Sequence, residues 1–283
     1  MIVLPIRVVG LFAALAFLVA LPLLSGCATA PDTKDADALA EFRQINDPLE
    51  PANRVIFAFN RAIDAAILKP LARIYRDFTP KVFQDAVSNI LANLRTPVVL
   101  ANDVLQGEGK RAGNTLARFV VNSTVGLGGM MDVASEISMP RHAEDFGQTL
   151  AVWGAPEGPY LMLPLFGPSN PRDLVGLAAD YFSDPINWYA ANTSREFITY
   201  SRTGTTGVDT RASHMKELDD LERTSLDYYA AIRSLYRQRR ADEISNGRGS
   251  SNMPAPGMSG LPAPAGGGAE ISAAPLAFEP MTD

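Results

Sequence analysis

The segment from Phe146 to Asp173 reads FGQTLAVWGAPEGPYLMLPLFGPSNPRD and combines an apolar composition with many residues that interrupt regular structure. It contains four glycines and five prolines, and Glu157 is its only charged residue before Arg172. A loop in water is normally polar, whereas a buried helix or strand rarely carries so many breakers. Irregular apolar backbone is tolerated where other helices or lipid shield it from water. The segment therefore raises the hypothesis of a pore or groove element at a membrane.

The whole chain has the composition of a folded protein rather than a disordered one. Its 283 residues are 47% hydrophobic and 20% charged, which is enough for one large domain or two small ones. The formal net charge of -6 argues against a nucleic-acid partner, because a phosphate backbone is bound by a basic surface.

The N-terminus has the pattern of a bacterial lipoprotein signal. Arg7 precedes an uncharged apolar run from Val8 to Leu24, which ends in Leu24-Ser25-Gly26-Cys27. A basic start, an apolar stretch and small residues before a cleavage point make a secretory signal. Cys27 is the only cysteine and stands where such a signal needs it, which favours acylation over a plain signal peptide or membrane anchor with an incidental cysteine. Ala28 follows it, where an Asp would commonly signal inner-membrane retention in enterobacteria, so the outer membrane is favoured.

This pattern predicts the order of the domains. Residues 1–26 form the signal peptide, Cys27 carries the lipid, residues 28–44 form a tether, and residues 45–244 form a single α-helical domain. Each buried methylene of an acyl chain adds roughly 0.8 kcal/mol, so several chains make a stable anchor. Residues 245–283 are rich in Pro, Gly and Ala and predict a disordered tail.

Apolar residues recur at three- and four-residue spacing through the domain, so the fold is predicted to be mainly α. We expect one helix to end at Pro70 and a break at Thr203 to Thr206, followed by one long charged helix, or two, from Val208 to Ile244. No segment alternates like a strand over any length. Expected helix starts, where a capping residue precedes proline, are Asp47-Pro48, Thr79-Pro80, Thr96-Pro97, Asn170-Pro171 and Asp184-Pro185.

Membrane contact is expected through amphipathic helices lying in the membrane plane. Beyond the signal, no apolar run reaches the roughly 20 residues that a spanning helix needs. A second charge-poor segment, Asn122 to Asp132, reads NSTVGLGGMMD. It lacks the dinucleotide fingerprint and the lysine of a phosphate loop, so it predicts a tight apolar turn whose glycines allow close backbone approach or a hinge.

The sequence indicates no catalytic residue, cofactor or metal. His142 and His214 are the only histidines, and neither has further ligands at short spacing. His142 with Glu144 or Asp145 could be drawn as the acid–base pair of a lipid hydrolase. Adjacent charges in a loop before an apolar run are usually solvated, and so are lone histidines, so we expect these side chains to face water.

Two further groups of charges have simple structural interpretations. Asp173 is expected in a first helical turn, where it favours the helix dipole and where Arg172 can pair with it. The end of the charged C-terminal helix is basic, which suits the helix dipole or, alternatively, a surface for an acidic partner or lipid headgroups. Its arginines are Arg233, Arg237, Arg239 and Arg240.

Several motifs, in order and without large gaps, resemble the MlaA (VacJ) lipoprotein family over about residues 46 to 240. The most specific are Asn46-Asp47-Pro48-Leu49-Glu50, Phe57-Ala58-Phe59-Asn60, Gly126-Leu127-Gly128-Gly129, Asp145-Phe146-Gly147-Gln148-Thr149-Leu150 and Gly158-Pro159-Tyr160. The chain departs from the pattern at Gln84, where a basic residue is expected, and at Ala86, where glycine is common.

The resemblance implies a ring of amphipathic in-plane helices that encloses a channel in the inner leaflet of the outer membrane. It also implies association with trimeric porins, removal of mislocalised phospholipid from the outer leaflet, and transfer to the periplasmic carrier MlaC. A structural lipoprotein that braces porins and a lipid hydrolase are the alternatives. The candidate channel or gate residues are Asn122, Gly126, Leu127, Gly128, Gly129, Met130, Gly158, Tyr160, Leu163, Pro164, Phe166, Gly167, Arg172 and Asp173.

Overall fold

The computed structural model describes residues 47–246, so the expected signal peptide, Cys27, the tether and nearly all of the expected tail lie outside the described residues. The expectation of a mainly α fold is confirmed. In the part of the chain that is described, no helix is both long and apolar enough to span a bilayer.

Helices follow one another with short connections. The first half of the described chain contains α3 (Glu50–Ile63), the π-helix η1 (Asp64–Leu68), α4 (Lys69–Phe78), α5 (Lys81–Leu105), α6 (Gly109–Thr124) and α7 (Val133–Glu136). The second half contains α8 (Phe146–Val152), β1 (Leu161–Leu163), β2 (Gly167–Ser169), α9 (Pro171–Ser183), α10 (Pro185–Asn192), α11 (Phe197–Ser213), α12 (Met215–Thr224) and α13 (Tyr228–Ile244).

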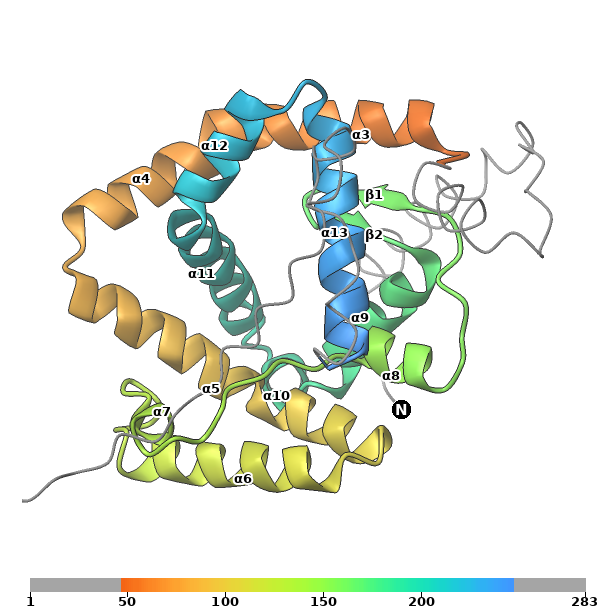
Figure 1. The fold of residues 1–283 in the computed structure, drawn as a ribbon. Coiled ribbons are helices and arrows are strands. Elements are labelled where there is room, and N and C mark those ends of the chain that lie inside the picture. The colour runs from red at the N-terminus through yellow and green to blue at the C-terminus, as the bar shows by residue number, and fades with distance from the viewer. Residues whose placement is uncertain (1–46, 247–283) are drawn as a thin grey trace, which may run out of the picture.

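These elements are arranged around a ring, with α3 and α4 on one side and α5 and α6 on another (Figure 1). α11 packs against α4 and α5, while α8 packs against α9. α13 lies across the remaining side, from α3 at one end to α8 and α9 at the other (Figure 1). The last described helix therefore closes the ring that the first one opens.

Pro70 and Pro97 lie in the interior of continuous helical stretches, which corrects the expected helix end at Pro70 and the expected start at Thr96. Pro70 follows the π-helix η1, in which the Lys69 amide donates to the Asp64 carbonyl five residues earlier. A wider π turn accommodates a proline ring that would clash with the preceding turn of an α-helix. Pro97 is inside α5, which continues to Leu105.

The other expected boundaries have mixed outcomes. Asn170 and Asp184 cap α9 and α10 as predicted, by accepting hydrogen bonds from the amides of Asp173 and Ile186 at 2.8 Å. The break predicted at Thr203 to Thr206 is wrong, because these residues lie inside α11. Residues 208 to 244 accordingly belong to three helices, α11, α12 and α13, rather than to one or two.

The hairpin of β1 and β2 is an element that the sequence analysis missed. It is antiparallel and pairs Leu161 with Ser169 and Leu163 with Gly167. Each strand has three residues, which is too short for alternation to be visible in the sequence, and the β2 segment contains a glycine and a proline.

Arg240 joins α13 to both α8 and α9. Its two terminal nitrogens each donate to an oxygen of Asp145 at 2.7 Å, and its Nε lies 2.7 Å from Asp173 Oδ2. Its guanidinium is almost fully buried, as is the Asp173 side chain. Neither interpretation of the basic helix end, dipole or surface, therefore describes Arg240, which serves as an internal ion-pair centre.

At its other end α13 is held against the start of α3. The Tyr229 hydroxyl donates to Asp47 Oδ2, and Arg233 Nη1 lies 3.4 Å from the same oxygen. Tyr229 also packs its ring edge against Phe57 and Tyr160, with centroids 5.4 Å and 6.0 Å away. Polar and aromatic contacts together fix this junction of the ring.

We expect Arg240→Ala to lower the free energy of unfolding by about 3–5 kcal/mol, because it leaves two buried carboxylates without their partner. Arg239→Ala is the matched control, since that side chain is exposed and its one ion-pair partner among the described residues is Glu243 on its own helix. The control should cost less than about 0.5 kcal/mol. Urea unfolding of the purified protein measures both, and equal losses would contradict the role given to Arg240.

Candidate functional site

The turn between α6 and α7 is organised by Asn122 and Asp132, one on each side of it. Asn122 Nδ2 donates to Asp132 Oδ1 at 2.9 Å, while Asn122 Oδ1 accepts from the Ala134 amide at 2.9 Å. Arg118 Nη2 donates to both oxygens of Asp132 at 2.8 and 2.9 Å. Asp132 also accepts from the Ser135 amide and so caps α7. The expectation of a tight turn between two helices is confirmed.

Glycines in this turn are required by both backbone conformation and space. Leu127, Gly128 and Gly129 have positive φ values of 53°, 72° and 92°. A Cβ on Gly129 would lie 2.6 Å from Asn93 Cβ, and a Cβ on Gly126 would lie 2.4 Å from the Met131 carbonyl oxygen. Leu127 and Met130, in contrast, expose their side chains.

The hairpin segment is held by two asparagines of α3 that are seven residues apart, and therefore on one face of that helix. Asn53 donates to the Tyr160 carbonyl at 3.0 Å and accepts from the Met162 amide at 2.8 Å. Asn60 repeats the arrangement with the Leu163 carbonyl and the Leu165 amide, at 2.9 and 2.8 Å. These side chains make backbone hydrogen bonds of the kind that a neighbouring strand would make.

The predicted residues of the hairpin segment differ in how far they are buried. Tyr160 and Leu163 are buried, Pro164 is half-buried, and Phe166 at the hairpin tip is 64% exposed. Gly158 and Gly167 have positive φ values of 73° and 82°. Their conformation explains why glycine stands at both positions.

The predicted pair Arg172 and Asp173 is present at the start of α9. Arg172 Nε donates to Asp173 Oδ1 at 3.1 Å, and both side chains are less than one-tenth exposed. Asp173 also accepts from the Tyr236 hydroxyl at 2.6 Å, besides its ion pair with Arg240. The pair thus belongs to the junction with α13. The hairpin and the α6–α7 turn lie on different sides of the ring (Figure 1).

His142 and Glu144 are not solvated, contrary to the prediction, because they enter a buried polar cluster with Asp103. His142 Nε2 lies 3.0 Å from both oxygens of Asp103, which is fully buried. Glu144 is 1% exposed and pairs with Arg111, while Gln106 donates to its other oxygen at 2.9 Å. Burial raises the pKa of Glu144, although Gln106 and Arg111 oppose that shift.

Of the two carboxylates that the hydrolase alternative pairs with His142, Glu144 lies close to it in this cluster, whereas Asp145 does not belong to the cluster. Asp145 faces Arg240 and caps α8 through the Gln148 amide, away from His142. Thr115 Oγ1 lies 3.1 Å from His142 Nε2, but Asp103 contacts the same nitrogen. A catalytic triad needs the acid on one imidazole nitrogen and the nucleophile on the other. His142 therefore does not orient Thr115 as the nucleophile of a triad.

Asp103, His142 and Glu144 are close enough to be tested as a metal site, since one ligand atom of each lies within 4.8 Å of the others. Arg111 Nε, however, is 3.7 Å from Asp103 Oδ1, and Arg111 Nη2 contacts Glu144 Oε1. This guanidinium already supplies the positive charge that two buried carboxylates require. The donor set thus fits an internal ion-pair network better than a cation site.

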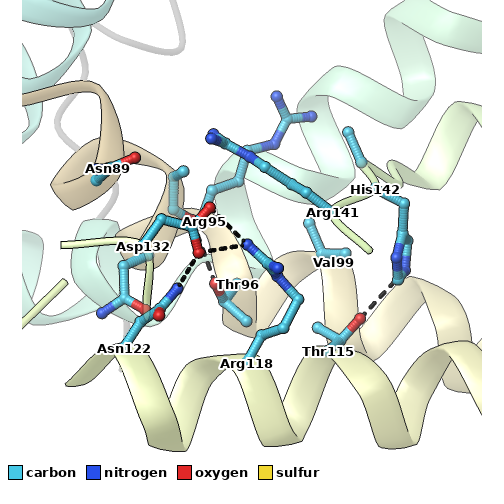
Figure 2. A pocket seen from close by; sticks show the side chains of 13 residues that line it. Asn89, Arg95, Thr96, Val99, Thr115, Arg118, Asn122, Asp132, Arg141 and His142 are labelled. Carbon is cyan, nitrogen blue, oxygen red and sulfur yellow. Dashed lines mark hydrogen bonds and ion pairs between the residues drawn. The ribbon is translucent and has the colours of Figure 1, made fainter. Parts of the chain in front are cut away.

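A pocket of about 160 Å³ lies beside this cluster, between α5, α6 and the segment that leads to α8 (Figure 2). Arg95, Arg118 and Arg141 all line it, and Asp132 is its only carboxylate. Other lining residues are Ala92, Val99, Thr115, His142 and Ala143. Of the candidate residues, Asn122 also reaches this pocket.

The sequence analysis missed several residues that organise the site. Asn53 and Asn60 could have been found from their seven-residue spacing, which places both on one face of an amphipathic helix. Asp103 was marked by its position in the otherwise apolar end of α5, where a lone charge needs a buried partner. Arg95 and Arg141 carry no local signal, because separate elements bring them together.

Comparison with known proteins identifies the family. A family model described as MlaA lipoprotein matches residues 45–243, which is well over half of the chain. The chain belongs to the MlaA lipoprotein family. The resemblance found in the sequence is thereby confirmed.

Two MlaA relatives share about a third of their residues with this chain. The "Intermembrane phospholipid transport system lipoprotein MlaA" of Escherichia coli is 34% identical over 229 residues, which cover 80% of this chain and 85% of that protein. The protein of the same description from Haemophilus influenzae is 32% identical over 228 residues, covering 80% and 87%. An uncharacterized protein of Rickettsia bellii is 34% identical over 203 residues, covering 71% and 78%.

A solved structure is similar in fold as well as sequence. It is described as "Structural basis for maintenance of bacterial outer membrane lipid asymmetry" and superimposes with a TM-score of 0.63 at 33% identity. The match covers 70% of this chain and 99% of the other. The described ring is therefore the MlaA fold.

We expect Gly129→Ala to destabilise this MlaA-family protein by about 3 kcal/mol, because it combines a positive φ with overlap against Asn93. Gly128→Ala is the matched control, since its φ is also positive but no atom lies within 4 Å of the position that its Cβ would take. It should cost about 1 kcal/mol. Thermal and urea unfolding measure both, and equal costs would show that Asn93 does not restrict the turn.

Asp132 makes stability depend on pH. Burial alone would raise the pKa of its carboxyl, but hydrogen bonds from Ser135, Asn122 and Arg118 outweigh burial and lower the pKa from 3.8 to about 2. A lowered pKa means that the carboxylate stabilises the fold above about pH 4 and that this contribution is lost as the pH falls towards 2.

We therefore expect Asp132→Asn to be less stable than the wild type by on the order of 1 kcal/mol at pH 6, allowing for solvent screening. The difference should shrink steadily as the pH approaches 2. Glu136→Gln, which removes an exposed carboxylate from α7, should change stability by less than about 0.5 kcal/mol. Urea unfolding across this pH range provides the measurement, and a constant difference for Asp132→Asn would be the contrary result.

Proposed function

We propose that this protein is an outer-membrane lipoprotein, anchored through Cys27, that removes mislocalised phospholipid from the outer leaflet and hands it to a periplasmic carrier. The membership of the MlaA family and the names of the relatives in Escherichia coli and Haemophilus influenzae support this role. The transfer is retrograde, towards the inner membrane, and maintains lipid asymmetry of the outer membrane. The proposed protein partners are trimeric porins and the carrier MlaC.

The observation that carries the proposal is an inverted distribution of polarity. Among the described residues, more of the buried side chains are polar or charged than hydrophobic. Large apolar side chains such as Phe78, Val82 and Trp188 are at the same time 82%, 77% and 66% exposed. A protein surrounded by water buries its apolar surface, and large exposed apolar areas mark contact with membrane or protein. This distribution suits a ring set into lipid.

In-plane insertion explains how such a ring meets the bilayer without a spanning helix. Exposed apolar side chains occur on α3, α4, α5, α6, α9, α10 and α11, and so on most sides of the ring. Amphipathic helices that lie in the interface plane bury one face among acyl chains and leave the other polar. We propose that phospholipid headgroups pass through the middle of the ring while the acyl chains remain against apolar wall.

The candidate channel and gate residues divide into two proposed roles. Leu127, Met130 and Phe166 are exposed on the two irregular segments, so they are the candidates for contact with lipid. The other candidates hold these segments in shape through positive-φ glycines, buried contacts or ion pairs. Substitution of the first group should change transport more than stability.

The competing functions require different features of the protein. A structural lipoprotein that braces porins would use the exposed apolar surface but would move no lipid. A hydrolase would need a nucleophile and an oriented base, and the contacts of His142 do not place Thr115 in the first of these roles. One transfer assay separates the three.

We expect a photo-crosslinkable phospholipid placed in the outer leaflet to reach the periplasmic carrier at least tenfold faster with this protein than in a deletion strain. Cys27→Ala should reduce transfer towards the deletion level, because it removes the acyl anchor. The acyl groups should arrive intact on the carrier.

Each alternative has its own outcome in this assay. Unchanged carrier labelling together with retained porin association would favour the bracing role and contradict transport. Release of free fatty acid or lysophospholipid that depends on His142 would favour the hydrolase. Expression of the Cys27→Ala variant is checked by immunoblot, so that a loss of transfer is not a loss of protein.

A further inference from the structure

The pocket between α5 and α6 contains an excess of positive charge in a chain whose net charge is -6. Three arginines line it, and Asp132 is the only opposing carboxylate. Asp132 is already engaged by the bidentate contact with Arg118 and by the amide of Asn122. The charges of Arg95 and Arg141 are therefore not neutralised inside the pocket.

Neither of these two arginines has a direct partner in the part of the chain that the structure describes. Within residues 47–246, Arg95 and Arg141 make no ion pair and no hydrogen bond. Arg95 is attracted by Asp180 at longer range, but the Asp180 oxygens accept from the Phe146 amide and from Asn102 Nδ2. Figure 2 shows both guanidinium groups on the side of the pocket away from α6, opposite Arg118.

The neutral polar groups of the pocket are, in contrast, occupied by the protein itself. Asn93 donates to Ser123, Asn89 to the Met130 carbonyl, and Thr115 to Asp103. The free donors are thus the N–H groups of two guanidiniums, which match the oxygens of phosphate in a planar fork. A neutral polar ligand would find few partners here, whereas an anion finds two.

The volume of the pocket and the residues that line it further restrict which ligand can bind. A volume of about 160 Å³ is below the roughly 300–1,000 Å³ of sites for drug-sized molecules, so the group that the pocket can enclose is small. Ala92, Val99 and Ala143 form an apolar part of the wall beside the arginines. A compact phosphate with a small organic substituent satisfies both surfaces.

We propose that Arg95 and Arg141 form a binding site for a phosphate group, with Arg118 and Asp132 as the rigid base of the pocket. The phosphate belongs either to the headgroup of a phospholipid or to a soluble phosphate compound. In the first case the inference rests on the proposed function and identifies a site that the lipid headgroup occupies during transport. In the second case the site is independent of transport.

Equilibrium binding to the purified full-length lipoprotein in a maltoside detergent, which contains no phosphate, tests the site directly. The probes are inorganic phosphate and dihexanoyl phosphatidylglycerol, a lipid with short chains. We expect Arg95→Gln/Arg141→Gln to weaken binding at least tenfold, since each charge-assisted hydrogen bond contributes on the order of a tenfold gain or more. Raising the salt concentration should weaken wild-type binding as well.

The matched control is Arg73→Gln/Lys216→Gln. It removes the same charge from exposed positions on α4 and α12 whose side chains also have no partner among the described residues. Its affinity for both probes should stay within about twofold of the wild type. Because Arg95 and Arg141 are exposed and form no pair with any described residue, their double variant should keep the circular dichroism and unfolding curve of the wild type.

The two probes separate the sources of the phosphate. Tighter binding of the lipid than of inorganic phosphate, lost in the double variant, supports a headgroup site. Equal or tighter binding of inorganic phosphate, also lost in the double variant, supports a site for a soluble phosphate. Binding of either probe that is the same in the double variant and the control, or no saturable binding, overturns the proposal.

Failure of this site and failure of the proposed function have different signatures. If carrier labelling in the transfer assay is normal but neither probe binds, only the site is wrong. If both probes bind through Arg95 and Arg141 but carrier labelling does not depend on the protein, only transport is wrong. The binding measurement needs neither a membrane nor a carrier.

Discussion

The ion pairs of Arg240 with Asp145 and Asp173 are the constraint on which the ring depends. They connect α13 to α8 and to α9, and those helices approach so closely that a Cβ on Gly176 would lie 2.3 Å from the Gly147 nitrogen. A buried guanidinium between two carboxylates is costly to desolvate and tolerates no missing partner. Closure of the ring is therefore specific, and contacts between α13 and α3 complete it at the other end.

Other buried charged groups of the chain are also held by ion pairs. Asp103, Glu144 and Arg111 form a second internal network, and Arg118 with Asp132 forms a third. Hydrophobic packing is limited to small clusters, such as Leu49, Leu161 and Leu163. A fold that exposes many large apolar side chains gains less from burying apolar groups, so directional polar contacts contribute more to specifying its shape.

The fold class and the family were predictable from the sequence, because helical periodicity and motifs such as Asp145–Leu150 are local. Predictions from local sequence were wrong where contacts between distant parts of the chain determine the structure. Pro70 was accommodated by a π turn, and the three-residue strands exist because asparagines of α3 hold them. The tight turn at Gly126–Gly129 was readable from its glycines, whereas the pocket required Arg95 and Arg141 to come from separate segments. The buried state of Glu144 likewise depended on an arginine 33 residues away.

The asparagine contacts along β1 have a consequence for how the hairpin meets other chains. A strand with an open edge offers unpaired amides and carbonyls to any passing extended segment. Here Asn53 occupies the Tyr160 carbonyl and the Met162 amide on one edge of β1, while Asn60 holds the Leu163 carbonyl and the Leu165 amide where the strand ends. This edge of β1 is thus blocked by a side chain of α3, so strand addition at it would first require these hydrogen bonds to break.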